Sequence, residues 1–132
     1  MGLFSRSKAP LDRRALARIG EEAAARLLTS QGYRLLERNY RGIGGEVDII
    51  ARQAQELVFI EVKARTDDSF GTPAQAVGRT KQRTIINLAQ GYIAQRVKRE
   101  VRWRVDIVEV WLTREGKVIK TNIIPGAFRP GS

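Results

Sequence analysis

Two short stretches decide the fold of this chain: GEVDII at residues 45–50 and VFIEVK at residues 58–63. Both are mostly apolar, as central strands are, yet both carry acidic side chains in their interior. Only a short polar connection at residues 53–56 separates them, so they are predicted to form an antiparallel hairpin. We therefore expect strands over residues 46–52 and 57–64.

The register of this hairpin decides where its charged side chains lie. Side chains alternate between the faces of a strand, so Asp48 is expected to share a face with Glu46. Its neighbours Val47 and Ile49 are expected to lie on the other face. The short loop favours Asp48 opposite Glu61 and Glu46 opposite Lys63, because a slip of one residue would press Asp48 against aliphatic side chains. The alternative is a solvated sheet face with ordinary cross-strand ion pairs.

The first flanking helix is expected over residues 12–30, with Asp12 as its cap and Gly32 beyond its end. A second helical region is expected over residues 72–98, beginning with a capping box and interrupted near Gly78. Both regions repeat apolar residues every three or four positions, as helices packed on a sheet do.

Three more strands complete the expected elements: an edge strand over residues 33–41, and strands over residues 102–112 and 118–124. The order is helix, three strands, helix, two strands, which predicts one α/β domain with a mixed sheet. The expected boundaries are a basic flexible tail (1–11), the domain (12–124) and a loose C-terminal tail (125–132).

The composition restricts the chemistry that this chain can perform. It has 132 residues, a net charge of +10, and neither histidine nor cysteine. A thiol nucleophile, a Cys/His zinc site and a Ser-His-Asp triad are therefore excluded. The charge favours polyanions, nucleic acid before a membrane, since no apolar run approaches the roughly 20 residues of a membrane span. The absence of disulfides fits a cytoplasmic protein.

Polar residues on the two helices extend the candidate site. Glu21 lies at the edge of the first helix's buried face and can reach the sheet, or it is a boundary residue in solvent, whereas Glu22 points outward. On the second helix Gln82 projects onto the buried stripe, with Lys81 at its edge. A core-facing amide needs partners, so Gln82 is either a satisfied core amide or a contact to phosphate or to a metal-bound water.

The hairpin carboxylates predict a metal site. Two carboxylates as close as Asp48 and Glu61 repel each other and coexist comfortably with a divalent cation between them. Oxygen-only ligands in a basic protein favour Mg²⁺ or Mn²⁺ bound jointly with a phosphate substrate. Lys63 is then placed to orient or deprotonate an attacking water, or to stabilise charge on the phosphate.

An acidic residue on one strand, Glu-x-Lys on the next and a glutamate on the preceding helix resemble the PD-(D/E)xK nuclease superfamily. The closer resemblance is to the YraN-type bacterial family, which is distantly similar to archaeal Holliday-junction resolvases. It spans about residues 19–128. The segments that carry it are GE (20–21), GGEVDII (44–50), VFIEVKAR (58–65), FGTP (70–73), KQR (81–83), VDIV (105–108) and AF (127–128).

This resemblance implies a restriction-endonuclease-like core and assigns roles by position. Asp48, Glu61 and the carbonyl of Val62 would be metal ligands, Lys63 the catalytic lysine, and Glu21 would complete the site. The remaining candidates are Lys81 and Gln82 as a polar pair beside the site, Arg65 as a family residue without a clear role, and Glu46 and Asp106 as accessory residues.

Basic clusters near the first helix (Arg13, Arg14) and after the second (Arg99, Arg102) are either solubilising charges or contacts to a phosphate backbone. Trp103 and Trp111 are interpreted as core or interface residues rather than base-stacking platforms. Binding is therefore expected to select nucleic-acid structure rather than sequence.

Three functions follow from this sequence. The first is a metal-dependent endonuclease acting on branched or single-stranded DNA, with DNA favoured over RNA. The second is a nucleic-acid-binding module with a nuclease fold and no turnover, and the third is a basic protein-interaction subunit. A homodimer is an option for a resolvase-like enzyme, because a four-way junction presents two symmetric scissile strands. No membrane partner is expected.

Overall fold

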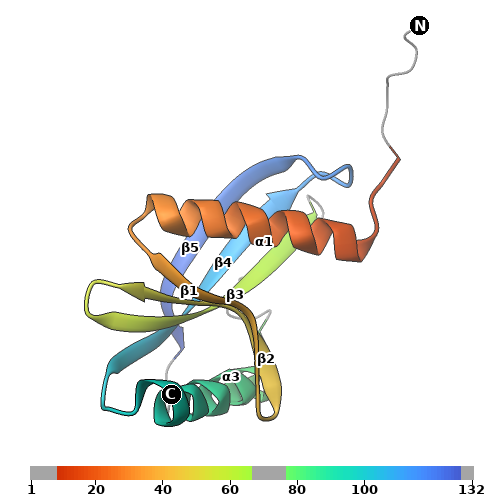
Figure 1. The fold of residues 1–132 in the computed structure, drawn as a ribbon. Coiled ribbons are helices and arrows are strands. Elements are labelled where there is room, and N and C mark those ends of the chain that lie inside the picture. Colours follow the sequence, from red (N-terminus) through yellow and green to blue (C-terminus); the bar gives the residue numbers. More distant parts are fainter. Residues whose placement is uncertain (1–8, 67–76, 129–132) are drawn as a thin grey trace, which may run out of the picture.

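The computed structural model describes residues 9–66 and 77–128 of the chain as a five-stranded sheet with a helix layer on each face (Figure 1). The strands follow one another across the sheet in the order β1-β2-β3-β4-β5, and only β3 and β4 run parallel. This arrangement confirms the predicted α/β fold class. The elements are α1 (Arg13–Ser30), β1 (Arg34–Gly42), β2 (Gly45–Gln53), β3 (Glu56–Thr66), α3 (Arg79–Tyr92), the π-helix η2 (Ile93–Val97), β4 (Arg102–Leu112) and β5 (Val118–Phe128).

Each face of the sheet has its own hydrophobic core. On β3, Val58 and Ile60 pack with α1, whereas Leu57 and Phe59 pack with α3. The alternation follows from the pleat of the strand, and both faces are apolar because a helix covers each of them. The central strand β3 is therefore buried on both sides, and any charge on it is placed in a nearly dry environment.

The hairpin of β1 and β2 twists sharply where Asp48 lies. Val47 packs in the core under α3 and Ile49 in the core under α1, so the expectation that they share a face is wrong. The reason lies across the ladder, where Asn39 has a left-handed backbone with φ of 51° between the paired positions Arg38 and Tyr40. A residue in this region interrupts the regular pleat. Beyond this point the hairpin bends toward α3 (Figure 1).

The last strand is longer than the sequence predicted. β5 continues through Pro125 to Phe128, so the expected loose tail is wrong for residues 125–128. β5 is an edge strand with an irregular register in this part, and such a strand tolerates a proline. Phe128 pairs with Val105 and is buried, which extends the domain beyond the predicted boundary.

The first helix has the predicted boundaries, and the end of the tail before it is ordered. Asp12 caps α1, since its carboxylate accepts a hydrogen bond of 2.8 Å from the N–H of Ala15. Leu11, assigned to the flexible tail, donates its N–H to Arg114 in the β4–β5 turn at 2.9 Å. The capping box at residues 72–75 lies outside the described residues, and Gly78 is the N-cap of α3. No helix in the described parts of the chain is long and apolar enough to cross a membrane.

Candidate active site

The ladder between β2 and β3 opens at Asp48. Paired positions run from the hairpin turn to Ile49 opposite Ile60, in the predicted register with Arg52 opposite Leu57. Next to the last pair, the carboxylate of Asp48 accepts a hydrogen bond of 2.7 Å from the N–H of Val62. A side-chain oxygen thus takes the place of a strand carbonyl, and this bond fixes Asp48 in the opening between the two strands.

Glu61 lies beside this opening on the α3 face of β3. It is 7% exposed, and its carboxylate is 3.6 Å from the ammonium of Lys81 on α3. Burial, and then the charge of Asp48, raise the pKa of Glu61 to about 7, against the opposing influence of Lys81 and Lys63. Burial also raises the pKa of Asp48, although the Val62 hydrogen bond favours its ionised form. Glu61 is therefore partly protonated near neutral pH.

Glu21 approaches the same opening from α1. Glu21 is half-buried, and burial and then the negative charge of Asp48 raise its pKa. Together with Lys63 and Arg13 it lines a cleft of about 440 Å³ between α1 and the end of β3. The other lining residues are Leu16, Ala17, Val62, Ala64 and Thr66.

A close contact between α1 and β3 sets the position of Glu21. Its neighbour Gly20 is buried against β3, and a Cβ built there would lie 3.0 Å from the Cβ of Ala64. Only a residue without a side chain lets the helix backbone come this near to the strand. Gly20 thus lets α1 pack closely on β3, and the next residue, Glu21, places its carboxylate at the opening.

Replacing Gly20 with Val should therefore lower the free energy of unfolding by about 1–3 kcal/mol, the usual cost of overpacking. Urea denaturation measures this change. The matched control is Gly91→Val in α3, where a Cβ would meet nothing within 4 Å, and its midpoint should stay within the error of the wild type. Equal midpoints for the two variants would contradict the proposed helix contact.

The two accessory candidates take different positions. Glu46 was expected opposite Lys63, but the β2–β3 pairing ends at Ile49, and Glu46 is exposed and pairs with Arg41 of β1 at 3.2 Å. Its negative charge still adds to burial in raising the pKa of Asp48 and of Glu21. Asp106 is fully buried, and its partners are the hydroxyl of Tyr33 at 2.7 Å, Arg104 at 2.8 Å and the N–H of Gly126 at 2.9 Å. It belongs to a structural network rather than to the candidate site.

The α3 candidates take different positions. Gln82 donates its amide to the carbonyl of Val77 at 2.9 Å, which is a local bond at the start of the helix. Of the two polar residues, Lys81 is the one that contacts a predicted site residue, through its ion pair with Glu61.

A buried pair beyond Lys63 contains a residue that the sequence analysis missed. Glu109 on β4 is 3% exposed, lies 3.9 Å from Arg65 and accepts a hydrogen bond from Asn122 at 3.2 Å. Two guanidinium nitrogens of Arg65, Nε and Nη2, are buried without a hydrogen-bond partner. An acidic residue within the apolar run VEVWL at 108–112 was the available signal, since a charge in a central strand needs a partner.

The arginines predicted to contact a phosphate backbone lie in two separate parts of the molecule. Arg13 and Arg14 are exposed at the start of α1, beside the cleft. Arg99 and Arg102 are exposed around the start of β4, which pairs with the start of β3 and is therefore remote from Lys63. The structure does not gather these four residues into one cluster.

The pKa of Glu61 makes stability depend on pH in metal-free buffer. Between the ordinary value of 4.5 and about 7, the folded chain keeps a proton that the unfolded chain has lost. The free energy of unfolding should therefore fall as pH rises through this window and level off above it. Urea midpoints across this range measure the slope. Glu61→Gln should remove most of this slope. Glu22→Gln, which alters an exposed ion pair with Arg38, should leave the slope unchanged. An unchanged slope in Glu61→Gln would contradict the raised pKa of Glu61.

The donor set fits a cation that keeps open positions for a substrate. Among the described residues, no three acidic side chains converge closely enough to hold a metal by themselves. Asp48 and Glu61 instead offer two neighbouring carboxylates, and burial, then the charge of Asp48, raise the pKa of Glu61. Mg²⁺ is commonly bound in this way, through one or two carboxylates together with substrate phosphate oxygens and water.

Comparisons with known proteins identify relatives of the whole domain. The model of the uncharacterised protein family UPF0102 matches residues 20–110. A UPF0102 protein of Moorella thermoacetica is 46% identical over 118 residues, which are 89% of this chain and 98% of that protein. One from Caldicellulosiruptor saccharolyticus is 38% identical over 89% of this chain and 100% of that protein. Among solved structures, SfsA of Pyrococcus furiosus in complex with Ca²⁺ aligns with a TM-score of 0.36 and 11% identity, over 82% of this chain and 62% of that chain.

Proposed function

The chain belongs to the uncharacterised protein family UPF0102, and from its site we propose that it is a metal-dependent endonuclease that hydrolyses DNA phosphodiester bonds. The observation that carries this proposal is the pair Asp48 and Glu61, two carboxylates brought together at an opening in a sheet of an otherwise strongly basic protein. Isolated buried charges are costly, so a pair of them with raised pKa values is typical of a functional site.

Each residue of the cluster has a part in this proposal. Asp48 and Glu61, with the carbonyl of Val62, would hold Mg²⁺ or Mn²⁺. A divalent cation bound there supplies electrostatic stabilisation of the charge on the phosphate. Lys63 lines the cleft and is placed to donate to the phosphate or to position the attacking water. Glu21, whose pKa is raised, is placed across the cleft to accept a proton from that water.

The charges around the cluster favour a nucleic-acid substrate. The carboxylates are surrounded by a chain with a net charge of +10, and the exposed Arg13 lines the cleft itself. Arginine side chains at a cleft bind phosphates without reading bases, so recognition here would follow the shape of the DNA backbone. Branched or single-stranded DNA is the substrate class that we propose.

The test is a panel of duplex, flapped, four-way and single-stranded DNAs incubated with Mg²⁺ or Mn²⁺. The matched variant is Asp48→Asn, which keeps an oxygen for the Val62 hydrogen bond but removes the charge. Cleavage by the wild type, lost in this variant and in EDTA, supports the proposal. Equal cleavage by the wild type and Asp48→Asn on every DNA would contradict the proposal. Binding without cleavage would favour a nucleic-acid-binding module instead.

A further inference from the structure

A second cavity lies at the opposite end of the sheet from the candidate active site. It is a shallow hollow, open to solvent, with a volume of about 630 Å³. Trp103 forms one wall and pairs with Leu57 at the start of β3, whereas Glu61 and Lys63 lie near the end of that strand. The cavity is lined by Gln90, Ile93, Ala94, Glu100, Val101, Arg102 and Trp103.

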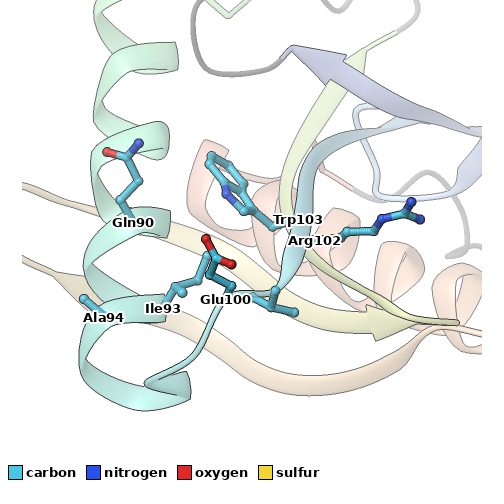
Figure 2. A pocket seen from close by; sticks show the side chains of 7 residues that line it. Gln90, Ile93, Ala94, Glu100, Arg102 and Trp103 are labelled. Atoms are coloured by element: carbon cyan, nitrogen blue, oxygen red, sulfur yellow. The ribbon is translucent and has the colours of Figure 1, made fainter.

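Trp103, which the sequence favoured as a core or interface residue, also offers an aromatic surface to this cavity. Its ring extends from β4 toward the helix (Figure 2). On its other side it meets Phe59 at 88° with 5.8 Å between ring centroids, which anchors it to the core. No other described aromatic ring packs on it, and the side chain is partly exposed. A fixed, partly exposed indole in a cavity is the usual platform for a stacked base.

Glu100 is an isolated carboxylate on a basic surface. It is the single acidic residue between Arg79 and Arg104, a stretch that contains eight lysines and arginines. It is exposed, and within the described residues it forms no ion pair. Figure 2 shows its side chain in the same space as the Trp103 ring, between the helix and the start of β4, while Arg102 points away. The cavity thus presents two acceptor oxygens beside an aromatic ring.

We propose that this cavity binds an unpaired guanine base of the nucleic acid. Guanine places two donors side by side on its Watson–Crick edge, the N1–H and the 2-amino group, and the two oxygens of one carboxylate accept both. Adenine, cytosine and thymine each place an acceptor beside the donor, which Glu100 would repel. Trp103 stacks on the base, and the exposed Lys98 and Arg99 lie next to Glu100 in the chain, where they favour the phosphates.

This inference rests on the proposed function in that it specifies which DNA the enzyme would hold. The two sites lie at opposite ends of α3, since Lys81 pairs with Glu61 and Gln90 lines the cavity. At 1.5 Å of rise per residue, these two positions are about 13 Å apart along the helix. A single strand of a few nucleotides spans this distance, so the preferred substrate carries an unpaired guanine a few nucleotides from the cleaved bond.

Binding in EDTA separates this site from catalysis. Fluorescence anisotropy would compare oligothymidylate of about eight nucleotides with the same strand carrying one central guanine or one central hypoxanthine. The wild type should bind the guanine strand about tenfold more tightly than the thymine strand, in line with the usual discrimination by one bidentate hydrogen-bonded pair of a side chain and a base. Hypoxanthine keeps the N1–H but lacks the 2-amino group, so its affinity should lie between the two.

Glu100→Gln should abolish the preference for guanine while leaving binding of the thymine strand unchanged or tighter. Trp103→Ala should weaken binding of the guanine-containing DNA. Trp111→Ala, which lies on β4 outside the cavity, should leave this binding unchanged. Because Trp103 contributes to the core, Ala94→Leu provides a second test: it fills the cavity from an exposed position, with Gln95→Leu as its control.

A guanine preference that survives Glu100→Gln, or guanine binding unaffected by Ala94→Leu, would overturn this site. The nuclease proposal fails separately. A chain that prefers guanine through Glu100 but cleaves no DNA would overturn the proposed activity alone, and a chain that cleaves DNA without this preference would overturn the guanine site alone.

Discussion

Replacing Lys63 with Met should slow DNA cleavage by about 100- to 10,000-fold, the usual range for losing a positioned acid, base or charge donor. Methionine keeps the length of the side chain but removes the ammonium that lines the cleft beside Glu21. Single-turnover kinetics with saturating protein measure the change in the chemical step. The affinity for Mn²⁺, measured by titration, should fall little, because the ammonium is not a metal ligand.

Lys81→Met is the matched control for this prediction. Lys81 is also a lysine beside Glu61, but its partner is that carboxylate, and it lies on α3 rather than in the cleft. Its loss should raise the pKa of Glu61 further and shift the pH dependence of cleavage upward, with a smaller effect on the maximal rate. Equal losses of maximal rate in the two variants would assign both lysines a general electrostatic role and contradict a specific role for Lys63.

Asp106→Ala should have the largest effect on stability, about 3–5 kcal/mol, because it removes the fully buried counter-charge of Arg104, which then keeps, among the described residues, only the ion pair with the less buried Glu56. Arg104 is 9% exposed and donates to Asp106 at 2.8 Å, while the hydroxyl of Tyr33 donates to the same carboxylate at 2.7 Å. The N–H of Gly126 is a third donor, so the loss should also loosen the end of β5. Urea unfolding measures the first effect and hydrogen exchange at β5 the second.

Tyr33→Phe tests the same network more gently. It removes one hydroxyl and keeps the ring, so it should cost about 0.5–1.5 kcal/mol, the usual net value of one hydrogen bond. If Asp106→Ala cost no more than this, the Arg104 pair would be of little importance for the fold. Cleavage by both variants should match the wild type while they remain folded, since Asp106 contacts no residue of the candidate site.

The sequence predicted the parts of the fold that depend on local patterns. The hairpin register could be predicted because a slip would have buried Asp48 among aliphatic side chains, and the short turn left little freedom. The cap at Asp12 and the strand at 102–112 also follow from local rules and agree with the structure. The candidate site was predictable to the same extent, because it consists mainly of residues on two paired strands.

The parts that could not be predicted depend on contacts between distant segments. The twist at Asn39 is a backbone conformation that no pattern of apolar residues reveals, and it moved Glu46 away from Lys63. β5 passes through Pro125 because the bulged edge strand gains the Gly126 bond to Asp106 and the burial of Phe128. The buried network of Asp106 was unpredictable for the same reason, since its partners Tyr33 and Gly126 are far away in the sequence.

The division of the site between the two helix layers has a consequence for chain synthesis. Asp48, Glu61 and Lys63 belong to the sheet, but Glu21 arrives with α1 on one face and Lys81 with α3 on the other. A nascent chain that has left the ribosome only as far as β3 would hold the two carboxylates without the cation of α3 that attenuates their repulsion. Completion of the site would then coincide with completion of the domain, because a chain truncated before α3 also lacks β4 and β5 of the sheet.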